Sequence, residues 1–142
     1  MFRSHGIVVA TVLPLLAIAL LACGNTNPNT YRALISVSVT PEIADAQNYP
    51  NGQVVFTATG TFNVSPLTGP VPSTVPYNGQ FGVANPVKPV PITIATIVAT
   101  GPSSATVECA AGATGTVSVF DSALANNGTS TTVSGQGQLT CP

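Results

Sequence analysis

Proline and glycine recur every few residues along most of this chain, and because both interrupt regular secondary structure, they limit what the chain can fold into. From Ala33 onward, the intervals between them are short runs rich in valine, isoleucine, threonine and phenylalanine, without the periodicity of an amphipathic helix. Short β-prone runs bounded by turn residues are typical of strands. The roughly 110 residues from Ala33 to Pro142 suffice for one domain and not for two, so we expect a single all-β domain.

Alternation within these runs predicts which side chains face the core. In Leu34–Thr40, the apolar residues Ile35, Val37 and Val39 alternate with serine and threonine, and we expect them on one face. Further strands are expected at 53–59, 80–83, 92–98, 105–109, 114–120 and 131–141, with Asn127-Gly128 as a turn between the last two. About seven short strands at this spacing favour an antiparallel β-sandwich.

The middle of the chain is rich in proline. Residues 66–91 hold seven of the thirteen prolines. Because proline lacks the N–H that a central strand donates, this region is expected to supply only edge strands and extended loops. Prolines at an edge also hinder the addition of foreign strands. The alternative interpretation is a docking segment for a partner.

The N-terminal segment has the pattern of a secretory signal. Arg3 precedes an uncharged, mostly apolar run from Gly6 to Ala22, and Pro14 interrupts it. A helix through those 17 residues would be about 25 Å long, which is short of the ~30 Å hydrocarbon core of a bilayer. We therefore interpret residues 1–22 as a signal-peptide helix that is cleaved, with an uncleaved anchor as the alternative.

The junction after this segment resembles a bacterial lipobox. It reads Leu20-Leu21-Ala22-Cys23 and is followed by a polar stretch that ends near Thr30. The resemblance to lipoproteins implies that Cys23 is acylated and becomes the N-terminus, with residues 23–32 as a flexible tether. Several acyl chains on one residue give stable membrane binding. Gly24 is not acidic, so we expect an exported protein anchored to the cell envelope at the outer membrane; an ordinary signal peptide with an incidental Cys23 is the alternative.

Residues 33–142 resemble a known family of bacterial domains. Gly52–Phe62, Val107–Val119 and Ser134–Cys141 are similar to strands of group 2 immunoglobulin-like (Big) domains. The resemblance extends from about Ser36 to Cys141 and is weak in the middle, where the family's tryptophan is missing and Phe81 is expected in its place. It implies an Ig-like sandwich, and it points to bacterial surface and adhesion proteins.

The three cysteines are explained together by these resemblances. If Cys23 is acylated, Cys109 and Cys141 remain as an even pair in a compartment that permits disulfides. In the implied topology both lie at one end of the sandwich, so we expect a Cys109–Cys141 disulfide. Two free buried thiols are the alternative.

The remaining chemistry is sparse. The single histidine, His5, lies in the signal segment, which excludes Ser-His-Asp, Cys-His and histidine-metal sites from the rest of the chain. Lys88 has no S-x-x-K partner, and three basic residues in all exclude a nucleic-acid binder. Asp121, just after an expected strand, is a candidate turn cap or calcium ligand, although the loops lack a D-x-D-x-D pattern. We expect no metal, no cofactor and no catalytic residue.

Three aromatic residues are candidates for ligand contact. Tyr49 and Tyr77 precede turn sequences, and Phe81 lies in a short expected strand. The leading prediction is a non-catalytic envelope lipoprotein whose Ig-like domain binds at the cell surface, to a protein or a glycan, or has a structural role. The first alternative is a carbohydrate-binding module that uses these aromatics. The second is a small hydrolase that uses two of the four acids, which are Glu42, Asp45, Glu108 and Asp121.

Overall fold

Two β-sheets packed face to face make up the part of the chain that the structure, a computed structural model, describes: residues 32–86, 92–126 and 128–142. The chain divides into two units, Met1–Thr30 and Tyr31–Pro142, and all described residues belong to the second. The predicted signal peptide, the acylation site Cys23 and the tether as far as residue 31 fall outside the described residues.

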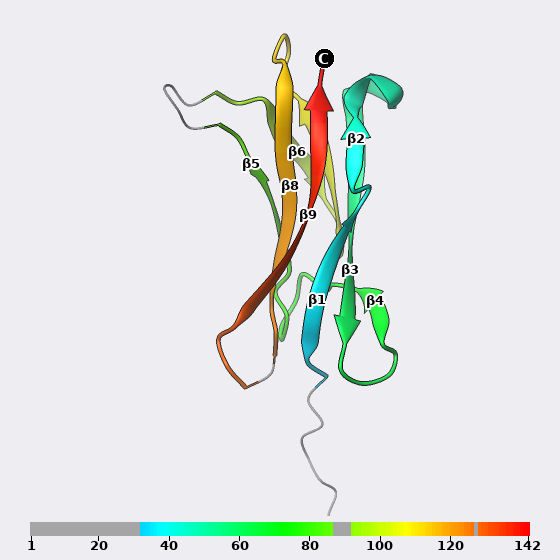
Figure 1. Cartoon of the computed structure of the whole chain (residues 1–142), viewed down its shortest axis with the longest axis vertical. Helices are drawn as coiled ribbons and strands as arrows, with labels where there is room; N and C mark the ends of the chain where they lie inside the picture. Colours follow the sequence, from blue (N-terminus) through cyan, green and yellow to red (C-terminus); the bar gives the residue numbers. More distant parts are fainter. Residues whose placement is uncertain (1–31, 87–91, 127) are drawn as a thin grey trace, which may run out of the picture. The chain divides into compact units, whose positions relative to one another are not determined.

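The strand order is that of an immunoglobulin-like sandwich (Figure 1). One sheet has the order β1-β3-β7-β6, with β4 added beside β3, and the other has the order β2-β9-β8-β5. These orders correspond to the A-B-E-D and C-F-G sheets of the immunoglobulin fold, so the predicted fold class is confirmed. The strands are β1 (Leu34–Thr40), β2 (Ile43–Asp45), β3 (Gln53–Phe62), β4 (Thr68–Pro70), β5 (Gln80–Ala84), β6 (Ala95–Thr100), β7 (Ser104–Cys109), β8 (Gly115–Leu124) and β9 (Thr132–Cys141).

The first strand region is shared between the two sheets. β1 pairs with β3 in the five-stranded sheet, whereas β2, two residues further on, pairs in parallel with β9 in the four-stranded sheet. Two of the four acids lie here: Glu42 directly precedes β2, and Asp45 ends it. The Asp45 carboxylate accepts a hydrogen bond of 3.0 Å from the N–H of Gln47, which caps the 3-10 turn η1 (Ala46–Asn48). A second 3-10 turn, η2 (Pro50–Gly52), leads into β3.

The alternation of apolar and polar residues correctly predicts which side chains of β3 face the core, but it does not do so at the start of β1. Val54, Phe56 and Ala58 are buried, and the side chains between them face outward. In β1, however, the pairing with β3 is shifted between Leu34 and Ser36, and Ile35 is 58% exposed. The shift adds one residue to the strand, so Leu34 enters the core in place of Ile35. The prediction that Ile35 shares the face of Val37 and Val39 is therefore wrong.

Two glycines on the inner face of β9 allow β1 to pass close to it. A methyl group at Gly135 would overlap the backbone carbonyl of Val37, and a methyl group at Gly137 would lie 2.5 Å from the carbonyl oxygen of Pro41. Contacts below 3.0 Å require the backbone to move, so glycine is needed at both positions for the two sheets to approach at this edge.

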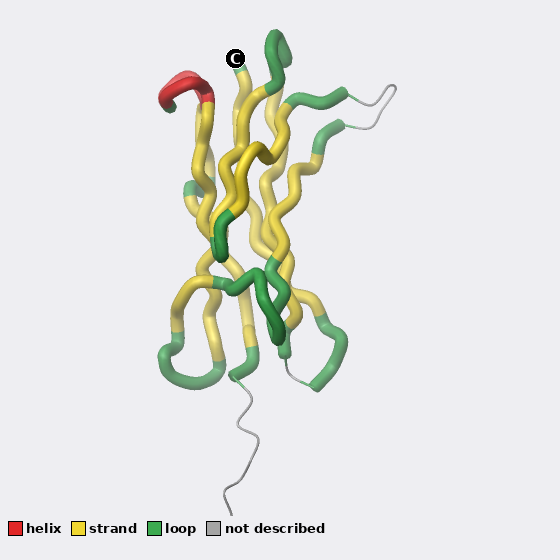
Figure 2. The backbone as a smooth tube through the Cα atoms, turned by 180° about the vertical axis from the view of Figure 1, so that it is seen from behind, coloured by secondary structure: helices red, strands yellow, loops and turns green. Residues whose placement is uncertain are grey.

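The proline-rich middle supplies only edge strands, as predicted. β4 and β5 each pair with a single neighbour, and residues 87–91 fall outside the described residues. Asn85, directly after β5, connects the two sheets on this side through its side chain. Figure 2 shows the strands of the sandwich from behind. The Asn85 side chain accepts hydrogen bonds from the N–H groups of Ile94 and Ala95 at 2.8 and 3.0 Å and donates one of 2.9 Å to the carbonyl of Ala95.

Replacing Asn85 with alanine should lower the free energy of unfolding by about 2 kcal/mol, because three part-buried backbone groups lose their partner at once. Urea titration of the variant and the unmodified protein measures this difference. Asn48→Ala, which removes an exposed asparagine side chain from η1, is the matched control and should change stability by less than about 0.5 kcal/mol. Equal effects of the two substitutions would show that Asn85 does not connect the sheets.

Candidate functional site

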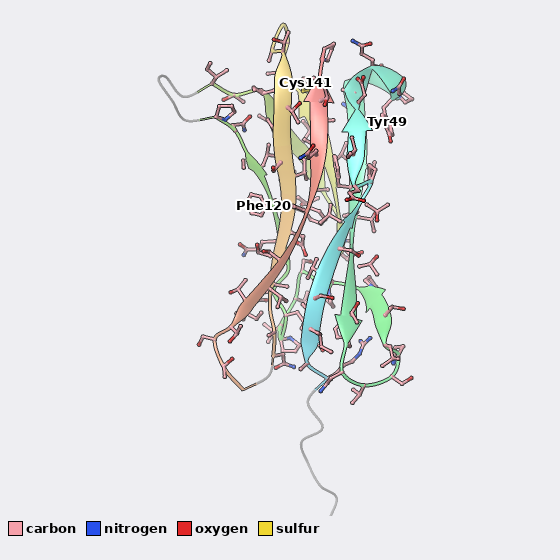
Figure 3. The ribbon with its side chains drawn as sticks, viewed as in Figure 1. Tyr49, Phe120 and Cys141 are labelled. Carbon is pink, nitrogen blue, oxygen red and sulfur yellow. A yellow bond between two sulfur atoms is a disulfide. The ribbon has the colours of Figure 1, made fainter. Side chains whose placement is uncertain are left out.

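The predicted disulfide is present and joins the two sheets. Cys109 ends β7 of the five-stranded sheet and Cys141 ends β9 of the four-stranded sheet, with an S–S distance of 1.98 Å and a Cα–Cα distance of 5.7 Å. Figure 3 labels Cys141 at the end of the sandwich where β9 finishes. The alternative of two free thiols is wrong. The third cysteine, Cys23, lies outside the described residues.

The four acids do not form a cluster. Glu108 is on the outer face of the five-stranded sheet, where it accepts a hydrogen bond of 3.2 Å from the side chain of Gln53, whereas Asp121 faces the interior. Glu42 lines a hollow beside Ile43 and Gln136. Within the described ranges, no three side chains of His, Cys, Asp or Glu are placed to hold a metal ion.

Asp121 is a buried core residue. The sequence predicted a turn cap or calcium ligand after a strand ending at Phe120, but β8 continues to Leu124 and places Asp121 on its inward face, 1% exposed. Its Oδ2 atom has no hydrogen-bond partner, and burial raises the pKa of this carboxyl from 3.8 to about 6. The prediction is wrong because the alternation of inward residues runs through Asp121 instead of stopping before it.

The three aromatic candidates for ligand contact do not lie together. Tyr77 is only 7% exposed, its ring meets the Phe62 ring edge to face at 5.5 Å, and its hydroxyl donates to the carbonyl of Arg32 at 2.5 Å. The Arg32 guanidinium in turn lies 3.6 Å above the centre of the Phe62 ring. The exposure expected of Tyr77 is therefore wrong, because these contacts make it part of the core where the described chain begins.

The other two aromatics lie apart from Tyr77 and from each other. Tyr49 is half-buried between the two 3-10 turns, which precede β3, whereas Phe62 beside Tyr77 ends that ten-residue strand. Ten residues of strand span roughly 30 Å. Phe81 is on the inward side of β5 and packs against the hydrophobic core.

Hollows gather instead on the outer face of the four-stranded sheet. The largest has a volume of about 540 Å³ and is lined by Phe120 and by residues on each side of it, from Ala84 of β5 to Gln136 of β9. A second hollow, of about 150 Å³, shares Gln136 and extends to Glu42 and Ile43; a third, of about 260 Å³, lies over Gln80, Ser122 and Leu124. We call this surface the outer sheet face; its outward residues are Gln80, Gly82, Ala84, Thr116, Ser118, Phe120, Ser122, Leu124, Thr132, Ser134, Gln136, Gln138 and Thr140.

Phe120 is the aromatic residue of this face (Figure 3), and it is not among the three aromatic candidates predicted from the sequence. Its ring leans across the neighbouring strand, so that a methyl group at Gly82 would overlap the ring. The alternation of side chains in β8 could have revealed its position on this face. Val117 and Val119 point inward, so Phe120 must point outward.

Comparison with protein-family models, with curated proteins and with solved structures finds no match to this chain. The structure itself establishes an all-β fold of two packed sheets joined by a disulfide. Among the described residues, no helix combines the length and the apolar character needed to cross a bilayer.

Proposed function

We propose that this protein is an exported bacterial lipoprotein, held at the cell envelope by an acylated Cys23, and that its sandwich is a Big-type Ig-like domain with a non-catalytic binding or structural role. The observation that carries the proposal is the disulfide between Cys109 and Cys141. Disulfides persist in oxidising compartments outside the cytosol. With those two cysteines paired, Cys23 is the remaining one, and it stands at the lipobox-like junction Leu20-Leu21-Ala22-Cys23.

The placement of the acids favours binding over catalysis. A glycosidase needs two carboxyl groups facing one cleft. Asp121 is enclosed in the core and Glu108 lies on the opposite sheet from Glu42, so these three do not share a surface. The Ig-like strand order and the interior position of Phe81 in β5 support the resemblance to Big domains, in which an aromatic of the third strand is expected inside.

The anchor is tested by comparing the unmodified protein with Cys23→Ser in a bacterial host. We expect an acyl-sized mass increase and membrane association for the unmodified protein, and we expect both to be lost in the variant. Intact mass spectrometry and membrane fractionation measure them.

The double variant Cys109→Ser, Cys141→Ser is the control for cysteine replacement. It should keep the acyl mass, because the disulfide has no part in lipidation. If the unmodified protein and Cys23→Ser are both released without acyl groups, the lipoprotein proposal is wrong, and the chain is a secreted sandwich with an ordinary signal peptide.

A further inference from the structure

Three hollows follow one another along the outer sheet face, with Phe120 beside the largest of them. Gln136 lines both the largest hollow and the one near Ile43, so these two hollows adjoin at its side chain on β9. The side chains around Phe120 are polar and uncharged: Ser118, Ser134 and Gln136. A half-buried aromatic ring among a few neutral donors and acceptors is the composition of a small-ligand site.

We propose that the outer sheet face binds a neutral glycan, with one sugar ring stacked on Phe120 and its hydroxyl groups bonded by Gln136, Ser118 and Ser134. This inference rests on the non-catalytic binding role proposed above and names its ligand class. A sugar ring has an apolar C–H surface bordered by hydroxyl groups, which matches an aromatic ring bordered by serine and glutamine.

Gly82 makes the ring available for stacking. Because Gly82 has no side chain, the Phe120 ring lies over β5 instead of standing away from the sheet, and its outermost atom Cζ is the one that a methyl group at Gly82 would meet first. A ring supported in this way has little freedom to lose on binding, which favours affinity.

The charges on the face select a neutral ligand. Arg32 is the only basic residue within the described ranges, and it is packed on Phe62, away from the outer sheet face. Glu42, at the end of the face, would repel an acidic polysaccharide. Among the described residues, the face therefore offers no cation to an anionic ligand.

The location on a sheet face favours a glycan over an extended peptide. Peptides that bind β-sheets add to an exposed edge through main-chain hydrogen bonds. The largest hollow spans β5, β8 and β9, and within the sheet the backbone groups of β8 are paired on both sides. Only side chains are left to make contacts there, and they are of the kind that bind sugar hydroxyl groups.

The experiment is a glycan array of neutral and acidic oligosaccharides, probed with the purified full-length protein and followed by affinity electrophoresis in the neutral polysaccharides that correspond to the hits. Phe120→Ala should weaken binding about tenfold by removing the stacking surface. Gln136→Ala should weaken it severalfold and leave the fold intact, because this side chain is exposed. Gln47→Ala, an exposed glutamine in η1 that lines none of the hollows, should bind like the unmodified protein.

Three results would overturn the proposal. These are no binding to any neutral glycan, binding that Gln136→Ala and Phe120→Ala leave unchanged, or a preference for acidic glycans. Binding of extended peptides that depends on Gln136, without glycan binding, would assign the face to a peptide instead. All of these results are independent of acylation at Cys23, so failure of the glycan proposal and failure of the lipoprotein proposal are distinguishable.

Discussion

Gly135→Ala should lower the free energy of unfolding by at least about 3 kcal/mol, because the added methyl group overlaps the backbone of Val37 in β1. The clash is with main chain, which cannot turn aside as a side chain can. β1 also pairs with β3 over most of its length, so moving it away would strain that pairing. Urea titration followed by circular dichroism measures the loss.

Gly69→Ala is the matched control for this substitution. Gly69 lies in the edge strand β4, and its added methyl group would meet only the end of the Arg32 side chain at 3.6 Å, an ordinary contact. Alanine at a compatible glycine position stabilises a protein slightly, by roughly 0.4–1 kcal/mol, because the unfolded chain loses freedom. If Gly135→Ala is as stable as Gly69→Ala, β1 does not approach β9 as closely as described.

Asp121→Asn should stabilise the protein by up to about 3 kcal/mol above pH 6. Burial raises the pKa of this carboxyl from 3.8 to about 6, so the folded state holds the proton more tightly than the unfolded state. The contribution of Asp121 to stability is therefore fully present below pH 3.8, is lost as the pH rises to about 6, and stays lost above it. The amide does not ionise and avoids that loss.

The measurement is the free energy of unfolding between pH 4 and 8 for the unmodified protein, Asp121→Asn and Asp45→Asn. The unmodified protein should become less stable as the pH rises toward 6, and Asp121→Asn should lack this decline. Asp45→Asn is the control, because Asp45 lies at the surface end of β2 and asparagine also caps helical turns. If stability still declines with rising pH in Asp121→Asn, another titrating group causes the decline.

Local sequence patterns predicted most of the strands, because successive side chains of a strand alternate between its two faces, and the residue types alternate with them. The run 34–40 matches β1, and the hairpin of β8 and β9 was expected from alternating runs on either side of a turn. Two features depend on distant parts of the chain and left no local signal. The parallel pairing of β2 with β9 joins residues almost a hundred positions apart, and the shift at Ile35 inserts one residue without disturbing the alternation that follows it.

The residues of the candidate site were predicted less well, because the exposure of Tyr77 and the role of Asp121 were inferred from neighbouring residues alone. Tyr77 precedes an Asn-Gly turn and was expected to be exposed, but its burial is decided by Phe62 and Arg32, which are distant in sequence. Asp121 interrupted an apolar alternation and was therefore interpreted as the end of a strand, although the pattern resumes at Ala123. The alternation in β8 could have predicted that Phe120 points outward. The hollow beside Phe120 also needs Gln136, which comes from β9.

The division of the first strand between the two sheets also determines how the domain resists a mechanical pull at its N-terminal end. β1 and β2 lie one after the other along the chain and are bonded sideways to β3 and β9, respectively (Figure 1). Because hydrogen bonds between strands are directed across the strands, tension along this segment shears several of them together instead of opening them one by one. If the domain is tethered by its first residues, as proposed, β1 and β2 would carry the force when a bound surface is pulled away from the cell.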